Sequence, residues 1–262
     1  MTSRLPVAVV AALCLLGTTA GADVKSKVVD YKQGSTPLQG FLAWDDAAKG
    51  KRPGIIVVHE WWGQNQHARD SALRLAKQGY VAFALDMYGK GKVTTHPKDA
   101  QAFMAEATKD PKAMDARFKA ALDILEKDPH VDPNKIGAIG YCFGGGVVLN
   151  EARQGADLKV VATFHGALRT DNPAKPGAVK PRLLVMTGAA DPMVTPEQVE
   201  AFKKEMTEAG AKFEVITYPG AKHAFTNRDA AKAGMDALAY NADADKKSWA
   251  EMVRVFKQVF GS

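Results

Sequence analysis

Short apolar runs alternate with segments of helical spacing along most of this chain, and this alternation constrains the fold more than any other feature. Residues 24–33 and 37–44 read as an antiparallel pair of strands joined through Gly34. Further buried strands are expected at residues 54–59, 80–85, 135–140, 159–165, 182–187 and 212–218. Helices are expected at residues 67–78, 98–108, 112–127, 195–209 and 244–259, with another ending near Arg153. This order predicts an α/β protein with a mostly parallel central sheet and helices on both faces.

The size and composition of the chain favour a single domain over residues 23–262. Hydrophobic residues make up 46% of the chain, which is enough for a large core. Charged residues make up 24%, so the composition does not indicate disorder. The sequence contains no internal repeat, low-complexity tract or linker that would divide it.

The first 22 residues have the pattern of a secretory signal peptide. Arg4 precedes an apolar run from Leu5 to Leu16, and the small residues Ala20-Gly21-Ala22 follow. Cleavage is expected after Ala22 or Ala20, and the mature protein is expected in the periplasm or outside the cell. The run is too short to span a bilayer, and the alternative is an uncleaved N-terminal anchor.

Charge and motif content exclude several kinds of partner. The formal net charge is +6 and the pI is near 9.1, but no basic stripe is interleaved with aromatic residues, so we expect no nucleic-acid partner. A metal site is not expected either, because Gly63 breaks the H-E-x-x-H spacing that would follow His59 and Glu60. We expect no cofactor, no stable membrane insertion, a monomeric protein and a small-molecule substrate.

The strongest chemical signal is the segment Gly140-Tyr141-Cys142-Phe143-Gly144, which lies between a predicted strand and a predicted helix. It has the form of a nucleophile elbow, a sharp turn that presents the central side chain above the sheet. Side chains two positions away would collide in such a turn, and glycine removes the collision. The start of the following helix also favours a thiolate at Cys142. The alternative is a Gly-rich turn that only packs helix on strand.

A cysteine nucleophile needs a base and a group that orients the base. Asp191 and His223 each lie in a loop just past a predicted strand, in the chain order nucleophile, acid, histidine. Taken alone, Asp191 would cap a helix and His223 would be a surface histidine. Together they predict a triad of Cys142, Asp191 and His223.

The loop after the early strand at residues 54–59 is expected to complete an oxyanion hole. Such a hole needs two converging N–H groups. We expect them to be the amides of Phe143, just after the nucleophile, and of Trp61. Glu60 precedes Trp61 and is an unusual carboxylate beside an apolar strand; the alternative is an exposed loop charge.

At this point the chain resembles the dienelactone hydrolase family of α/β-hydrolases. The matching pieces lie in family order and are His59-Glu60-Trp61-Trp62-Gly63, Asp86-Met87-Tyr88-Gly89, Gly140-Tyr141-Cys142-Phe143-Gly144-Gly145, Gly188-Ala189-Ala190-Asp191-Pro192 and His223-Ala224-Phe225. The resemblance implies the α/β-hydrolase fold and the same three triad residues. It also implies that Glu60 holds the resting thiol and takes its proton when substrate binds.

The resemblance identifies candidate substrate-binding residues as well. Tyr88 lies in a matching piece and is expected to contact substrate. The lactone hydrolases of the family clamp a substrate carboxylate with two arginines, and the corresponding positions here are Lys90 and Asn227, with Arg228 one place further on. Lys90 supplies charge without a bidentate fork and Asn227 supplies none. We therefore expect weaker preference for anionic lactones than for neutral small esters.

Three functions remain open from the sequence. The leading one is an exported hydrolase of small esters or lactones that forms an acyl-enzyme thioester. The second is a peptidase or other acyl hydrolase on the same fold. The third is a non-catalytic binding protein with a vestigial triad.

Overall fold

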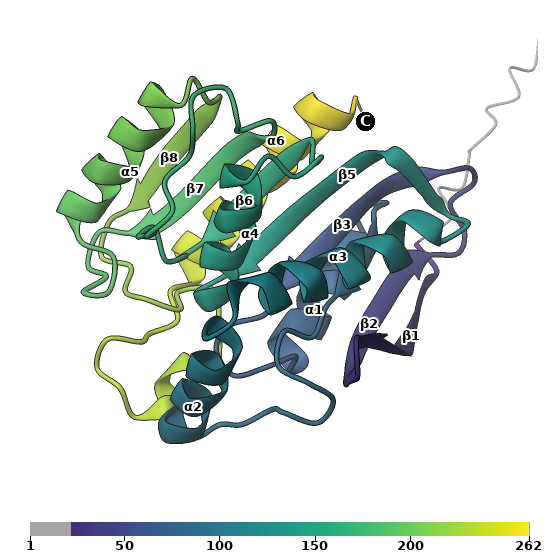
Figure 1. Cartoon of the computed structure of the whole chain (residues 1–262), viewed down its shortest axis with the longest axis horizontal. Coiled ribbons are helices and arrows are strands. Elements are labelled where there is room, and N and C mark those ends of the chain that lie inside the picture. Colours follow the sequence, from purple (N-terminus) through teal and green to yellow (C-terminus); the bar gives the residue numbers. More distant parts are fainter. Residues whose placement is uncertain (1–21, 262) are drawn as a thin grey trace, which may run out of the picture.

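The computed structural model describes residues 22–261, which form one sheet of eight strands covered by helices (Figure 1). The strands are β1 (Val24–Gln33), β2 (Thr36–Asp45), β3 (Arg52–Val58), β4 (Val81–Ala84), β5 (Val131–Tyr141), β6 (Val160–Phe164), β7 (Arg182–Gly188) and β8 (Phe213–Tyr218). The signal-peptide prediction falls on residues that lie, except for Ala22, outside the described part of the chain.

The strand order in the sheet is β1-β2-β4-β3-β5-β6-β7-β8. The pairs β1–β2 and β2–β4 are antiparallel, and every other neighbouring pair is parallel. The predicted mostly parallel sheet with an antiparallel N-terminal pair is therefore confirmed. Because the parallel strands share a direction, their carboxyl ends meet at one edge, where open α/β sheets place their functional groups.

Helices cover both faces of the sheet, as predicted. α1 (Gln66–Ala76) and α6 (Ala242–Phe260) pack on one face, and the side chains there include Leu75 and Phe256. α3 (Pro111–Lys127), α4 (Phe143–Arg153) and α5 (Pro196–Glu208) pack on the other face, with Phe118 and Phe202. All four named side chains are almost fully buried, so the core consists of two apolar layers with the sheet between them.

A third, smaller apolar cluster lies outside these layers. It joins α2 (Pro97–Thr108) to the short 3-10 helix η1 (Ala230–Ala233) through Ala100 and Ala230, and it includes Trp62 from the loop after β3. α2 and η1 lie side by side in Figure 1. Three segments far apart in the sequence are thereby held together, and one of them is the loop that contains Glu60 and Trp61.

The predicted elements are all present, but two local features differ from the sequence interpretation. β5 begins at Val131 and not at residue 135, because Arg52 and Pro53 pair with Val131 and Asp132 before the register shifts. The turn-forming residues at 133–134 conceal this first part of the strand. η1 was not predicted, since four residues are too few to show a period.

Candidate active site

Cys142 lies at the turn between β5 and α4 with a left-handed backbone, φ 51° and ψ −117°. The turn brings backbone atoms very close. A Cβ on Gly140 would lie 2.1 Å from the carbonyl oxygen of Gly144, and a Cβ on Gly144 would lie 2.4 Å from that of Val58. Both contacts are with backbone, which cannot swing away, so the predicted need for glycine on both sides of Cys142 is confirmed.

Backbone hydrogen bonds fix the position of Cys142. Its N–H donates to the carbonyl of Phe164 at 3.1 Å, and its own carbonyl accepts the N–H groups of Gly145, Gly146 and Ala167. The thiol is free and the residue is partly exposed. A strained conformation held this firmly is a common feature of functional sites.

Asp191 and His223 come together as predicted. Asp191 follows β7 and His223 follows β8, and Nδ1 of His223 lies 2.8 Å from Oδ2 of Asp191. Both side chains are buried, and the other carboxylate oxygen accepts the N–H of Met193 at 2.8 Å. A buried carboxylate on Nδ1 stabilises a proton there and leaves Nε2 as the basic nitrogen.

The chemistry of Nε2 of His223 depends on Cys142. This nitrogen is buried and makes no hydrogen bond of normal geometry within residues 22–261. Burial lowers the pKa of His223, but the charge of the nearby Cys142 sulfur and the hydrogen bond with Asp191 raise it more. The net result raises the pKa of His223 to about 10. A pKa this high favours the protonated, imidazolium form of His223.

The loop after β3 lies against the start of α4, as an oxyanion hole would require. A Cβ on Gly144 would lie 2.6 Å from the carbonyl oxygen of His59, two residues before Trp61. Neither the N–H of Phe143 nor that of Trp61 donates a hydrogen bond within the described chain. Both amides are therefore available to a ligand, which is the condition that the predicted roles impose.

His59 holds this loop in place, a role that the sequence did not predict. Its ring is fully buried and bonds the carbonyl of Glu60 through Nδ1. Nε2 accepts the N–H of Met87 at 3.1 Å. The ring thus ties the loop after β3 to the loop after β4, which holds Tyr88.

Glu60 is buried, so the alternative of an exposed loop charge is wrong: only 1% of the residue is accessible. Its Oε2 accepts a hydrogen bond from Nδ2 of Asn227 at 2.6 Å and lies 3.9 Å from Nδ1 of His67. No hydrogen bond joins Glu60 to Cys142 among the residues described. The implied contact between Glu60 and the resting thiol therefore stays a prediction.

The four predicted substrate-binding residues have different surroundings. Asn227 is buried and committed to Glu60, and the ammonium of Lys90 pairs with Asp30 of β1 at 2.7 Å. Arg228 is exposed and lies over the ring of Tyr240 at 5.6 Å. None of these contacts brings a cation to the triad.

Tyr88 is the fourth of these residues, and it is packed close to the candidate nucleophile. Its ring lies 5.4 Å from that of Phe143 and 4.8 Å from that of His59. Its hydroxyl is buried and has no hydrogen-bond partner in the described range 22–261. Burial raises the pKa of Tyr88, and the nearby charge of Cys142 adds to the effect.

His165 and Thr226 also adjoin the triad, and the sequence interpretation missed both. The rings of His165 and His223 are 5.2 Å apart, and Nε2 of His165 lies 2.8 Å from Oγ1 of Thr226. Across residues 22–261, positive φ outside glycine occurs at Cys142, His165 and Ala224. His165 directly follows β6, which pairs with β5, the strand that leads into the elbow. This position is the signal that could have identified His165.

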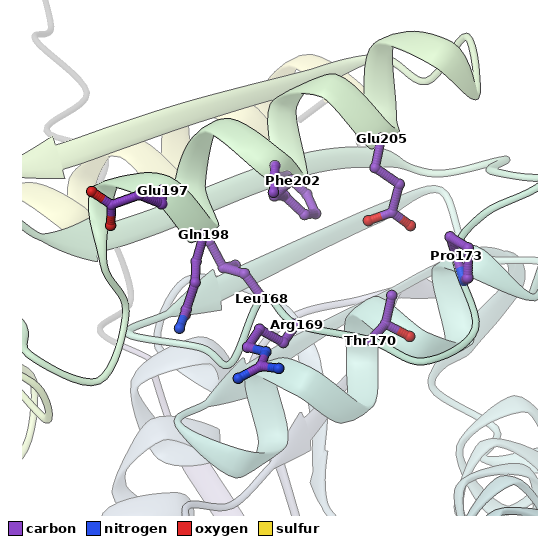
Figure 2. A pocket seen from close by; sticks show the side chains of 9 residues that line it. Leu168, Arg169, Thr170, Pro173, Glu197, Gln198, Phe202 and Glu205 are labelled. Atoms are coloured by element: carbon purple, nitrogen blue, oxygen red, sulfur yellow. The ribbon is translucent and has the colours of Figure 1, made fainter.

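A hollow of about 390 Å³ lies between α5 and the loop after β6, and Figure 2 shows side chains that line it. Leu168 and Thr170 line one side, and Gln198 and Phe202 line the other. None of the triad residues contributes to it. Two smaller hollows, of about 300 and 260 Å³, share His67 and Asn227 and so adjoin the partners of Glu60. The triad and its surroundings, and not the hollow of Figure 2, form the candidate active site.

Two kinds of feature are absent from residues 22–261. No helix in this range is long and apolar enough to cross a membrane. No group of three or more His, Cys, Asp or Glu side chains in the same range is arranged to hold a metal ion.

Known proteins resemble this chain along most of its length. The model of the dienelactone hydrolase family matches residues 38–260. A putative carboxymethylenebutenolidase from Synechocystis sp. is 28% identical over 251 residues, which cover 90% of this chain and 97% of that protein. A probable 2-oxo-3-(5-oxofuran-2-ylidene)propanoate lactonase from Bradyrhizobium sp. is 30% identical over 185 residues, which cover 67% of this chain and 74% of that protein.

A solved structure is similar as well. The crystal structure of a dienelactone hydrolase-like promiscuous phosphotriesterase from metagenomic libraries has a TM-score of 0.86 and 36% sequence identity. The match covers 92% of this chain and 100% of the other. Together with the sheet order, it confirms the α/β-hydrolase fold that the sequence predicted.

Proposed function

Since the chain belongs to the dienelactone hydrolase family and hydrolyses ester or lactone bonds, we propose that it does so through a thioester formed on Cys142. The observation that carries this proposal is the arrangement of Cys142, His223 and Asp191. The nucleophile has a strained, fixed backbone, and the histidine has a buried carboxylate on Nδ1. The raised pKa of His223 gives further support, since it depends on the Cys142 sulfur.

The proposed reaction has two steps. In the first, the Cys142 thiolate attacks the carbonyl carbon, and the amides of Phe143 and Trp61 stabilise the oxyanion. The imidazolium of His223 gives its proton to the departing alkoxide, which leaves as an alcohol. In the second step, His223 takes a proton from water as the resulting hydroxide attacks the thioester carbonyl. The C–S bond then breaks, the carboxylic acid is released, and the Cys142 thiolate is regenerated beside the protonated His223. Asp191 orients and stabilises the ring throughout.

We assign to Glu60 the role that the family resemblance implies: its carboxylate holds the resting Cys142 thiol and takes its proton when substrate binds. Its burial supports a function, because a buried carboxylate is costly unless it has partners. Asn227 and His67 are those partners. Movement of Glu60 toward Cys142 would require the bond with Asn227 to break.

The proposed substrates are small neutral esters or lactones. An anionic substrate needs a cation in the site, and the candidate cations lie elsewhere. Lys90 is paired with Asp30, and Arg228 is exposed over Tyr240. Neutral phosphotriesters are a second candidate class, supported by the 36% identity with the dienelactone hydrolase-like promiscuous phosphotriesterase. Attack by the same thiolate on phosphorus would give a phosphorylated cysteine in place of a thioester.

Mass spectrometry of the trapped enzyme tests the central claim. Rapid acid quenching during turnover of a slow ester should add the acyl mass to the peptide containing Cys142. Cys142→Ala should lose this adduct and nearly all activity, because a triad acts as a unit. Cys142→Ser should retain low activity, since a hydroxyl is activated poorly in a site built for a thiolate.

The controls separate loss of chemistry from loss of fold. Circular dichroism should show that the variants keep the wild-type secondary structure. Parallel assays with a neutral ester, an anionic lactone, a phosphotriester and a short peptide distinguish the candidate substrates, including the peptidase alternative. If folded Cys142→Ala hydrolyses esters at the wild-type rate, the thioester mechanism is wrong.

Export is also part of the proposal. The charged start, apolar run and small residues before Asp23 support a cleaved signal peptide and a periplasmic or secreted mature enzyme.

A further inference from the structure

A row of four polar side chains lies beside the triad, and the proposed mechanism does not use most of them. Nδ1 of His67 lies 3.9 Å from Oε2 of Glu60. On the other side of the ring, Nε2 of His67 lies 3.3 Å from Oγ1 of Thr226. The same hydroxyl lies 2.8 Å from Nε2 of His165. The row of polar side chains therefore runs from a carboxylate, through one imidazole and one hydroxyl, to a second imidazole.

The members of this row come from four separate parts of the fold. Glu60 follows β3, His67 is in the first turn of α1, His165 follows β6 and Thr226 follows β8. Glu60, His165 and Thr226 are buried, and the side chain of His67 is only 15% exposed. The ring of Tyr141 lies 4.7 Å from that of His67 and closes one side. Polar groups at this depth are costly unless they bond to one another.

The hydrogen bonds within this row have one donor-to-acceptor direction. A threonine hydroxyl carries one proton, so Thr226 donates to one imidazole and accepts from the other. Nδ1 of His67 makes no hydrogen bond within residues 22–261, but unlike Nδ1 of His165 it lies 3.9 Å from a carboxylate oxygen, that of Glu60. The negative charge of this carboxylate favours a proton on Nδ1 of His67. Nε2 of His67 must then accept the hydroxyl proton. The oxygen of Thr226 in turn accepts a proton from Nε2 of His165.

This direction also agrees with the surroundings of His165. Its Nδ1 is buried and has no partner within residues 22–261. A buried N–H without an acceptor costs more than a buried ring nitrogen that carries no proton, because the N–H is the group more rarely left unpaired. The predicted form of His165 has its proton on Nε2, bonded to Thr226, and none on Nδ1.

We propose that His67 and Thr226 are positioning residues that transmit the charge of Glu60 to His165 and fix its tautomer, so that a neutral ring of defined orientation packs against His223. The rings of His165 and His223 are 5.2 Å apart at an interplanar angle of 64°. This inference rests on the proposed function of His223, and it adds two positioning residues, His67 and Thr226, to the triad.

The consequence concerns the imidazolium that His223 forms during turnover. A second positive charge on His165 would repel it across 5.2 Å. Burial, together with His223 and His67, holds the pKa of His165 well below its ordinary value, so the ring stays neutral. The Thr226 hydroxyl adds orientation, because it gives Nε2 of His165 its only hydrogen bond among the described residues.

Nitrogen-15 NMR of the histidine rings tests the tautomers directly. In the resting wild-type protein, His67 should carry its proton on Nδ1 and His165 should carry its proton on Nε2. Thr226→Val removes the hydroxyl at nearly constant volume and should abolish the fixed tautomer of His165. Thr226→Ser retains the hydroxyl and should restore it.

Kinetics should follow the same order. Thr226→Val should lower kcat about ten-fold, the effect of one lost hydrogen bond, and leave KM unchanged because the buried hydroxyl is not expected to touch substrate. Thr226→Ser should recover most of the rate. Thr187→Val is the matched control, since Thr187 is equally buried and its hydroxyl makes no hydrogen bond in the described chain. It should leave both kcat and the histidine spectra unchanged.

The outcomes separate this inference from the proposed function. The ring spectra can be recorded in Cys142→Ala as well, where no turnover occurs, and the same two tautomers are expected there. A wild-type His165 with its proton on Nδ1, or unchanged spectra in Thr226→Val, would overturn the inference whatever the activity. If these tautomers are observed but no thioester forms on Cys142, only the proposed function is overturned.

Discussion

Burial and charge act in opposite directions on the imidazole of His223, and charge has the larger effect. Burial alone would lower its pKa, yet the Cys142 sulfur and the hydrogen bond with Asp191 raise it from 6.5 to about 10. A group whose pKa is raised on folding stabilises the folded state fully below its unfolded pKa. That stabilisation is lost as the pH rises through the folded pKa.

The upward shift of the His223 pKa predicts how the stability of the protein depends on pH. The contribution of His223 should be complete below about pH 6.5 and should disappear as the pH approaches about 10. In Cys142→Ala the charge of the sulfur is absent, so the pKa of His223 should lie closer to its ordinary value and the decline should be smaller. Urea unfolding of both proteins at several pH values between these limits measures the difference. An equal decline in both proteins would mean that Cys142 does not act on His223.

The sequence predicted the positions of three site residues in the fold better than those of the other site residues. Cys142, Asp191 and His223 each follow a strand, so local patterns placed them at one edge of the sheet. Glu60 is different, because its partner Asn227 lies 167 residues away and only the folded chain brings the two together. The sequence could not show that Glu60 is buried or that Asn227 is already occupied.

Among the elements, the junction of β5 and α4 has little room for added side-chain atoms. α4 starts so close to the loop after β3 that a Cβ on Gly144 would lie 2.4 Å from a backbone oxygen of Val58. Two positions further along the same helix, a Cβ on Gly146 would meet the Cβ of Ala167 at 3.3 Å, a much milder contact. The two glycines therefore differ in the space around them, although both lie in the first turns of α4.

Alanine at each position should show this difference. Gly144→Ala should lower the free energy of unfolding by about 1–3 kcal/mol, because a methyl group cannot be accommodated against backbone atoms without a shift. It should also lower activity, since the shift would displace Cys142 or the loop of Glu60 and Trp61. Gly146→Ala should leave stability unchanged or raise it by up to about 1 kcal/mol through helix propensity. Urea unfolding and ester hydrolysis measure both effects, and equal destabilisation would contradict the close approach.

The helices and strands themselves were largely predictable because their signals are local. Apolar runs bounded by glycine or polar residues define β3, β6 and β7, and helical spacing defines α3 and α6. The early part of β5 was missed because its polar residues 132–134 read as a turn, and only pairing with Arg52 and Pro53 makes it a strand. Long-range pairing of this kind leaves no periodicity in the sequence.

For the whole molecule, the antiparallel edge at β1 and β2 links the described fold to the predicted export. The N–H of Asp23 donates to Oδ1 of Asp45 at 2.9 Å, and the carbonyl of Asp23 accepts the N–H of Asp46 at 2.8 Å. These bonds lie outside the predicted signal peptide. Removal of residues 1–22 would therefore leave every strand of the sheet intact, and a new amino group on Asp23 would face the Asp45 carboxylate.

The export prediction follows from this geometry and from the N-terminal sequence. N-terminal sequencing of the protein from a periplasmic or secreted fraction should start at Asp23 or, with cleavage after Ala20, at Gly21. Lysine in the apolar run, as in Val10→Lys with Leu13→Lys, should block export and leave the full-length chain in the cell, because charge there prevents recognition of the signal. Thr18→Ser is the matched control and should be exported and cleaved normally. The new charge pair between Asp23 and Asp45 is exposed, so it should stabilise the mature protein by at most about 1 kcal/mol. An intact Met1 on the active enzyme in the cytoplasm would contradict the prediction, and an intact chain held at the membrane would favour the uncleaved anchor.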